Sequence, residues 1–492
     1  MISQYKFPTA LIHLLILSKS AASLGVDFTQ HRLFSDQLTS QIYTSPNEFS
    51  SALGVSMAFS LIYPGSTNDA AAEISASLGY LTNGSPNSNM QLVWEDVSTS
   101  LTSRADGTCG FGDGDSGMCY GGKKPLLSIA NSIWIDDGDA LNVEYEAVVG
   151  NYSKQIDFQS TDSPQIINSW VNNQTNGLVD SIVQEGTPLP GVLIAINSLY
   201  LKASWANPFY ESNTNLDSFY SSTVRSDEVS KAHFMHRVGK MRYSHDVMAG
   251  YQIAQLPFAA SSMSMVFVLP TTETNENMAL VPSSTLIPAL TNLKETRVAL
   301  ALPKFKFESE YDDNLKEALQ NIGVVSPFKG GTQSLCNIFA ADIYPCEQLF
   351  ISKILQKTVI DVNEDGVEAA AVTAIFIEKT SSGLMDQPEP VLMMLNHPFQ
   401  FFIYDQDEEL VLFEGRLGEL ESQEEEPTSS MLDLVHADED FWQSSFGVNP
   451  VNPPILAIED ESSASSVGAN IQYALVLACG VSAMALGSLL VL

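Results

Sequence analysis

The sequence predicts a globular fold that mixes α-helices with β-sheet, and three observations support this. Helical and strand-like segments alternate along the chain, without an internal repeat or a clear linker between its two ends. With 492 residues and 45% hydrophobic content, the chain can bury a large core. The segment 362–383 adds a β-rich run late in the folded part.

The first 23 residues have the pattern of a secretory signal peptide. Lys6 precedes the apolar stretch Phe7 to Leu17, and small residues follow as far as Ser23. As an alternative, these residues could extend the first helix backwards, because the segment Phe28 to Ile42 is amphipathic. We expect the signal peptide, and with it a secreted, extracellular protein.

Residues 81–124 are rich in Gly, Ser and Asn and are predicted to form an irregular, insertion-like excursion. Four cysteines form two close pairs in loops, which favours local disulfides made in an oxidising compartment: Cys109 with Cys119, and Cys336 with Cys346. A metal site is not expected, since no histidines lie nearby. Three glycosylation sequons are compatible with secretion: Asn83, Asn151 and Asn173.

The motif GDSG at residues 114–117 is similar to the nucleophile loop of trypsin-like proteases, and its aspartates suggest a calcium loop. A Ser116 nucleophile would need a histidine base, and none of the seven histidines has the sequence context of that family. An EF-hand would need two flanking helices and a glutamate at the twelfth position. We therefore predict an ordinary turn, and no catalytic residue, metal or cofactor.

Two later segments have clear periodicity. Met263 to Leu269 alternates as a strand. Asp312 to Ile322 is predicted to be a helix that ends at Gly323, because glycine commonly closes a helix. Three residues mark its buried face: Leu315, Leu319 and Ile322.

The segment 362–383, VNEDGVEAAAVTAIFIEKTSSG, combines opposing signals. Its three alanines after Glu368 favour a helical turn, whereas the β-branched and aromatic run 372–377 favours a strand. A strand would sort its faces, with Glu368 and Glu378 on one side and only uncharged residues on the other: Val367, Ala369, Ala371, Thr373, Ile375 and Ile377. Such a strand could enter a sheet.

The C-terminal region has the pattern of a linker followed by a membrane anchor. Residues 421–470 contain eleven acidic residues and no Lys or Arg, so they form an acidic, disordered linker. The tail, residues 471–492, carries about the 20 apolar residues that a bilayer requires, with no basic residue after them. Small residues precede it, which favours a glycolipid-anchor signal over a transmembrane helix: Ser462, Ser463, Ala464, Ser465, Ser466 and Gly468.

The net charge of −35, from 58 acidic and 23 basic residues, disfavours nucleic acid and heparin as partners. Both require clusters of Lys and Arg, and no such cluster is visible in the sequence. We expect a monomer.

Several motifs, in order, closely resemble the serpins. The hinge-like run VNEDGVEAAAVTAIFI is followed by NHPFQFFIYDQDEELVLFEGRLGEL at residues 396–420. Three upstream segments are also similar to serpins: INSWVNNQTNGLVDSIV, INSLYLKASWANPF and LPKFKFESEYDDNLKEALQNIGV. The resemblance covers roughly residues 27–420. It implies an α+β, serpin-like fold with a large central β-sheet, additional sheets, about eight or nine helices and a mobile reactive loop near the C-terminal end of the domain.

The resemblance implies a suicide inhibitor of serine proteases, or alternatively of cysteine proteases, that has no catalytic residue of its own. A target protease cuts the loop and is trapped in a covalent complex when the cut loop inserts into the central sheet. The hinge of that loop would comprise Glu364, Gly366, Val367, Glu368, Ala369, Ala370, Ala371, Val372 and Thr373. A non-inhibitory serpin that acts as a carrier, chaperone or receptor ligand is the alternative.

Two further groups follow from the resemblance. Trp205 and Asn197 are placed near the region where the loop enters the sheet, and Ser51, Gly54 and Gln356 in the cluster beneath the opening sheet. Three residues depart from the usual pattern: Val367 replaces Thr or Ser, Gln356 replaces a histidine and Gly54 replaces a serine. Valine nearly matches threonine in shape, so loop insertion should survive.

The sequence offers three alternatives for the reactive bond. The usual serpin span from Gly366 reaches the bond Thr380-Ser381, which suits an elastase-like protease. Lys379 would instead suit a trypsin-like enzyme. Leu384 or Met385 would suit a chymotrypsin-like enzyme, since the segment 381–395 is longer than usual.

Overall fold

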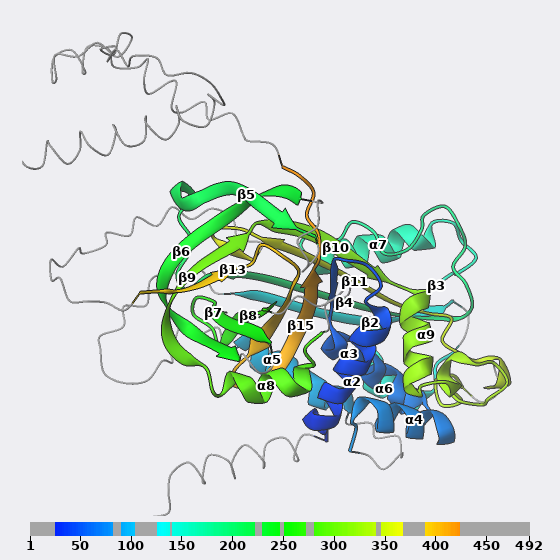
Figure 1. The fold of residues 1–492 in the computed structure, drawn as a ribbon. Coiled ribbons are helices and arrows are strands. Elements are labelled where there is room, and N and C mark those ends of the chain that lie inside the picture. The colour runs from blue at the N-terminus through cyan, green and yellow to red at the C-terminus, as the bar shows by residue number, and fades with distance from the viewer. Residues whose placement is uncertain are drawn as a thin grey trace, which may run out of the picture. The chain divides into compact units, whose positions relative to one another are not determined.

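Helices and strands alternate to build two β-sheets, and the predicted α+β class is confirmed (Figure 1). Contacts group the described residues into one unit. The computed structural model describes residues 25–81, 90–103, 125–137, 140–221, 229–246, 250–271, 280–340, 346–367 and 389–423. In these ranges there are eight α-helices: α2 (Phe28–Ile42), α3 (Ala52–Ile62), α4 (Asn68–Leu78), α5 (Met90–Ser103), α6 (Val143–Val149), α7 (Ser163–Gln174), α8 (Ser283–Leu290) and α9 (Asp313–Ile322).

The two sheets have six and nine strands. The six-stranded sheet has the order β10 (Phe305–Tyr311), β11 (Lys353–Val362), β12 (Gly366–Val367), β4 (Leu193–Ser204), β2 (Leu126–Asp136), β3 (Ser153–Ile156). The nine-stranded sheet has the order β1 (Glu48–Ser50), β15 (Leu410–Leu417), β14 (Phe399–Asp405), β8 (Met263–Pro270), β7 (Tyr251–Pro257), β6 (Val229–Asp246), β9 (Lys294–Pro303), β13 (Val391–Met394), with β5 (Thr214–Tyr220) paired to β6.

The predicted periodic segments form the expected elements. Strand β8 begins at Met263, and helix α9 ends at Gly323, whose φ of +116° is the left-handed conformation that glycine adopts easily. Leu315 and Leu319 are buried, while Ile322 is half-buried. These two elements are confirmed: α9 packs one face on the core, whereas β8 is buried on both faces.

Helix α2 begins at Phe28, as its amphipathic pattern predicts. The carboxylate of Asp27 caps it by accepting hydrogen bonds from the N–H groups of Thr29 at 2.9 Å and Gln30 at 3.3 Å. The alternative in which the first residues extend this helix backwards is therefore wrong. The predicted signal peptide, residues 1–23, lies outside the described residues.

The irregular excursion predicted at residues 81–124 is wrong in part, because residues 90–103 form helix α5. Buried Trp94, Val97 and Leu101 lie at helical spacing and anchor α5 on the core. Burial of these three side chains stabilises the helix although the flanking segments are rich in Gly, Ser and Asn. Residues 104–124, with Cys109, Cys119 and the GDSG motif, lie outside the described residues.

The six-stranded sheet is covered on both faces, and this positions the candidate site. Ile194 and Ile196 of β4 pack in a cluster with Ile167 of α7. The alternate residues Ala195 and Leu199 belong to the main core, which includes α3. Strand β4 is therefore buried along most of its length.

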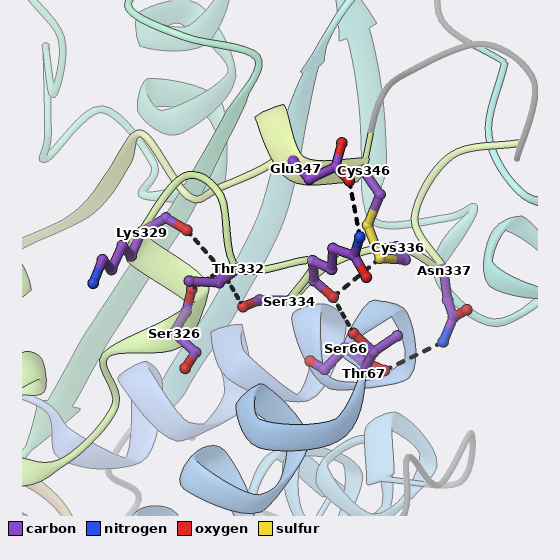
Figure 2. Close-up of a disulfide and its surroundings, with 11 residues drawn as sticks. Ser66, Thr67, Ser326, Lys329, Thr332, Ser334, Cys336, Asn337, Cys346 and Glu347 are labelled. Atoms are coloured by element: carbon purple, nitrogen blue, oxygen red, sulfur yellow. Dashed lines mark hydrogen bonds between the residues drawn. A yellow bond between two sulfur atoms is a disulfide. The ribbon is translucent and has the colours of Figure 1, made fainter.

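The disulfide between Cys336 and Cys346 is present, with a Cα–Cα distance of 5.1 Å (Figure 2). Beside it, Gln333 Nε2 donates to Glu347 Oε1 at 2.8 Å, so the two cysteine-bearing segments are also joined by a hydrogen bond. Asn337 Nδ2 donates to the carbonyl of Ser66 at 3.3 Å, which ties this region to the end of η1 (Tyr63–Gly65) (Figure 2).

Two predicted sequon residues, Asn151 and Asn173, are exposed, whereas Asn83 lies outside the described residues. The described helices include none that is long and apolar enough to cross a bilayer. The structure describes the predicted acidic linker only as far as Gln423, and the predicted hydrophobic tail falls outside it.

Candidate functional site between strands β4 and β11

The candidate site is the junction of β4 and β11 in the six-stranded sheet. These strands pair directly, in parallel, only from Lys353–Lys357 on β11 to Ile194–Ser198 on β4. Beyond that ladder, the short strand β12 lies between them. Val367 of β12 is opposite both Val362 of β11 and Ala203 of β4.

A tight turn sends the chain from β11 back into β12. The Asn363 carboxamide oxygen accepts hydrogen bonds from the N–H groups of Asp365 at 3.0 Å and Gly366 at 3.2 Å. A Cβ atom on Gly366 would collide with the carbonyl oxygen of Ala203, which is backbone and cannot move aside. Glycine is thus required for β12 to approach β4.

Trp205 secures this turn from β4. Its indole N–H donates to the carbonyl of Asn363 at 2.9 Å, and its backbone N–H donates to the carbonyl of Asp365 at 2.8 Å. The ring stacks on Phe258, with centroids 5.1 Å apart. Trp205 therefore fixes the point at which the chain enters the sheet, in addition to filling the core.

Glu364 is held by an ion pair and a hydrogen bond. Its carboxylate lies 3.0 Å from Lys304 Nζ and accepts a hydrogen bond from Thr214 Oγ1 at 2.8 Å. Burial would raise the pKa of Glu364, but hydrogen bonds from Thr214, its own backbone and Lys304 outweigh burial and hold the pKa below its usual value. The carboxylate is therefore charged at neutral pH, and it anchors the hinge to β5 and to the end of β9.

Val367 is 3% exposed and belongs to the main core cluster. An uncharged residue at this position lets β12 lie between two buried strands without an unpaired charge. The rest of the predicted hinge, Glu368 to Thr373, lies outside the described residues, as do all the candidate residues of the reactive bond: Lys379, Thr380, Ser381, Leu384 and Met385.

Four other predicted residues lie together beneath the directly paired part of β4 and β11, and we call them the shutter cluster: Ser51, Gly54, Asn197 and Gln356. The Gln356 side chain accepts from the Ser51 N–H at 3.0 Å and donates to the Ser51 carbonyl at 2.8 Å. It also donates to Asn197 Oδ1 at 2.6 Å. Gln356 thus joins β11 to both β4 and the N-cap of α3.

The replacement of serine by Gly54 has a local structural role. A Cβ atom at Gly54 would collide with Asn197 Oδ1 and with Leu199 Cδ1. Glycine therefore allows Asn197 to approach α3 closely and accept the hydrogen bond from Gln356. The two departures from the usual pattern are therefore structurally compatible: Gly54 leaves room for Asn197, and Asn197 accepts the hydrogen bond from Gln356.

Trp205 and Asn197 occupy different parts of the junction. They are eight residues apart on one extended strand, or roughly 26 Å at ~3.3 Å per residue. Trp205 lies where β12 enters, whereas Asn197 lies in the shutter cluster.

Sequence reasoning missed three residues of the site: Thr214, Lys304 and Asn131. Asn131 Oδ1 accepts a hydrogen bond from Asn197 Nδ2 at 2.7 Å and carries the shutter cluster across to β2. All three act across strands that are distant in sequence. Among the described residues, no group of three or more His, Cys, Asp or Glu side chains could hold a metal ion.

This geometry can accommodate a further strand. Separation of β4 from β11 would break a ladder of five residue pairs and the bond from Gln356 to Asn197. A strand that continued from Val367 would then pair with β4 on one side and β11 on the other. We call this junction of β4 and β11 the seam. At one end of the seam, β12 already separates the two strands.

Sequence comparisons identify related proteins along nearly the whole described chain. Iripin-3 of Ixodes ricinus is 30% identical over 390 residues, which cover 77% of this chain and 90% of that protein. Antithrombin-III of Homo sapiens is 29% identical, with 82% of this chain and 81% of that protein covered.

Solved structures agree on the fold. Serpin48, a highly specific serpin of the insect Tenebrio molitor, has a TM-score of 0.63 and 25% identity, with 80% of this chain and 97% of that chain covered. Thyroxine-binding globulin in complex with thyroxine also has a TM-score of 0.63, at 21% identity, with 80% of this chain and 98% of that chain covered.

The family model described as serpin (serine protease inhibitor) matches residues 29–419. That range includes both sheets, the turn at Asn363 and the shutter cluster. The chain belongs to the serpin family.

Proposed function

We propose that this serpin is a suicide inhibitor of serine-type endopeptidases, with cysteine proteases as an alternative target class. The observation that carries the proposal is the position of Gly366 and Val367 between β4 and β11. The first residues of the proposed hinge thereby occupy the place where an inserted strand would begin. Serpins as a family are protease inhibitors rather than enzymes.

The chemistry belongs to the protease. Its serine hydroxyl attacks the carbonyl carbon on the N-terminal side of the reactive bond, and the peptide bond breaks. The new amine takes up the proton and leaves with the C-terminal part of the loop. The N-terminal part stays joined to the protease as an ester, and water must hydrolyse this ester before the enzyme is free.

Release of one loop end makes insertion possible, since an uncut loop is tethered at both ends. About fourteen inserted residues would carry the attached protease roughly 45 Å, at ~3.3 Å per residue. A strand of this length pairs on both sides, so it gains about twenty-eight ladder hydrogen bonds while about five are lost, at ~1 kcal/mol net each. Fixing the backbone of about fourteen loop residues costs on the order of 14 kcal/mol. The net gain is on the order of 10 kcal/mol, enough to support distortion of the acyl-enzyme before deacylation.

Small hinge residues suit this step. The proposed strand places Ala369 and Ala371 on the same face as Val367, which is buried. Alanine adds little volume to a packed interior, so insertion needs no large rearrangement of neighbouring side chains. The β-branched run that follows favours an extended conformation.

A protease panel tests the proposal. The chain is incubated with trypsin-like, elastase-like, chymotrypsin-like and cysteine proteases, and denaturing gels are searched for a covalent complex. Mass spectrometry of the released peptide locates the reactive bond. A new N-terminus at Ser381 supports Thr380-Ser381, one at Thr380 supports Lys379, and a cut after Leu384 or Met385 supports the chymotrypsin-like alternative. Cleavage without any complex across the panel would contradict inhibition.

The second candidate is a non-inhibitory carrier, chaperone or receptor ligand. Val367 stands where inhibitory serpins usually have Thr or Ser, and thyroxine-binding globulin, a neighbour in fold, is solved with bound thyroxine. Cleavage without a covalent complex would favour this candidate.

For localisation, we propose secretion after removal of residues 1–23 and a tether through the C-terminal tail, by a glycolipid anchor or a transmembrane helix. The disulfide between Cys336 and Cys346 is compatible with an oxidising compartment. Release of the protein from intact cells by a phospholipase specific for the glycolipid would support the anchor, whereas retention would favour the helix.

A further inference from the structure

The last described residues, 421–423, lie beyond the range 29–419 that is shared with the serpins, and they pack on strand β6. We call these three residues the C-terminal strap. The Gln423 N–H donates to the carbonyl of Lys231 at 2.7 Å, and the Lys231 N–H donates to Ser422 Oγ at 3.3 Å. The strap therefore follows the edge of β6.

Gln423 also binds β6 through its side chain. Its Oε1 accepts a hydrogen bond from the His233 N–H at 3.0 Å and lies 2.8 Å from His233 Nδ1. A carboxamide oxygen can only accept, so Nδ1 carries the hydrogen in this contact. Strand β9 pairs with β6 only from Phe234 onwards. The strap thus covers backbone groups of β6 that the end of this ladder would otherwise expose to water.

The strap lies next to the residue that joins the two sheets. Lys304 stands between β9, which ends at Pro303, and β10, which begins at Phe305. The Lys304 N–H donates to the carbonyl of His233 at 2.8 Å, so His233 binds the strap through its N–H and Lys304 through its carbonyl. Lys304 Nζ lies 3.0 Å from the Glu364 carboxylate. A continuous series of contacts therefore runs from the strap to the hinge.

The hinge depends on the positions of the two partners of Glu364. The Glu364 side chain is only 12% exposed, so little water could replace the Lys304 ammonium if Lys304 moved away. The second partner, Thr214, is the first residue of β5 and lies opposite Met235 of β6. Both partners of Glu364 are thus positioned by the part of β6 that the strap approaches.

We propose that the C-terminal strap positions Lys304 for its ion pair with Glu364, and that Gln423 is therefore a positioning residue for the hinge. The strap fixes His233, and the His233 carbonyl holds the backbone of Lys304. This effect on the hinge turn follows from the contacts alone. A consequence for inhibition rests on the proposed function: a hinge that is held less firmly begins insertion from a less ordered strand, so more loops are cleaved without trapping the protease.

Hydrogen exchange on the full chain tests the positioning. Gln423→Met keeps the length of the side chain but removes the accepting oxygen. The control Glu421→Met makes the same replacement at a neighbouring exposed residue. Gln423→Met should speed amide exchange roughly threefold or more at residues 231–233 and also in the hinge turn, residues 363–366. Glu421→Met should leave the exchange of both segments unchanged.

Lys304→Met tests the route of the coupling. This variant should speed exchange in the hinge turn by itself. Gln423→Met in the same chain should then add little in the hinge turn, while it still speeds exchange at residues 231–233. If Gln423→Met alone changed only residues 231–233, the link to the hinge would be overturned. Full addition of the two effects in the hinge turn would overturn the route through Lys304, and unchanged exchange in both segments would overturn the strap.

The consequence for inhibition is measured with a protease that forms the covalent complex. Gln423→Met should roughly double the number of serpin molecules consumed per protease inhibited, because a smaller fraction of chains has an ordered hinge. Glu421→Met should match the unmodified chain. Unchanged stoichiometry together with faster exchange in the hinge turn would overturn this consequence. If no protease forms a complex, the proposed inhibition fails while the exchange result stands.

Discussion

Val367→Arg tests whether the seam between β4 and β11 receives the loop. Val367 is 3% exposed, between Val362 and Ala203. An unpaired arginine is not tolerated in this buried position, so β12 of Val367→Arg is expected to leave the sheet before cleavage. Insertion must then bury the arginine charge, which costs several kcal/mol. A barrier higher by only ~3 kcal/mol slows insertion about 150-fold. The protease should then complete deacylation first, and the variant should be cleaved as a substrate.

The assay titrates protease activity against increasing serpin and follows the covalent complex on denaturing gels. Val367→Ala separates charge from volume, because it removes apolar burial without adding a charge, and it should remain an inhibitor. Val143→Arg adds the same charge at a position that is 80% exposed and should inhibit like the unmodified chain. If Val367→Arg formed complexes at the original stoichiometry, the insertion mechanism would be refuted.

Three further outcomes are expected. Ala370→Arg should also turn the inhibitor into a substrate, since a bulky charge in the inserting strand slows insertion; unchanged complex formation on gels would count against this strand. Gln356→Ala should lower the free energy of unfolding by about 2–4 kcal/mol in chemical denaturation, because it leaves buried partners of three hydrogen bonds unsatisfied; a loss below 1 kcal/mol would contradict the role of the shutter cluster. Burial raises the pKa of Glu414 to about 8, so the protonated form is favoured in the folded protein, and the stability contribution present below about pH 4.5 is lost as pH rises to about 8. Glu414→Gln should flatten this part of the profile of melting temperature against pH, and an unchanged profile would reject the assignment.

Much of the fold could be predicted from the sequence where one segment carries its own pattern. The α9 helix has apolar residues at helical spacing and a closing glycine, and β8 is a nearly continuous apolar run. Helix α5 was missed because its apolar positions are surrounded by polar and small residues. The local sequence does not show that Trp94 is buried, so burial of Trp94 could not be set against the polar composition of the segment.

The candidate site was predictable in part. The resemblance indicated Trp205, Gln356 and the hinge, but not which of them touch. The ion pair of Glu364 with Lys304 joins residues 60 positions apart, and the bond from Asn197 to Asn131 joins residues 66 positions apart. Such pairs depend on the register between strands, which one sequence does not display.

The central claim is that the cut loop becomes a strand between β4 and β11. The most direct test cleaves the loop with a protease that is not trapped and compares melting temperatures before and after cleavage. A gain on the order of 10 kcal/mol should raise the melting temperature by about 10 °C or more. An unchanged melting temperature, with cleavage verified by mass spectrometry, would contradict insertion.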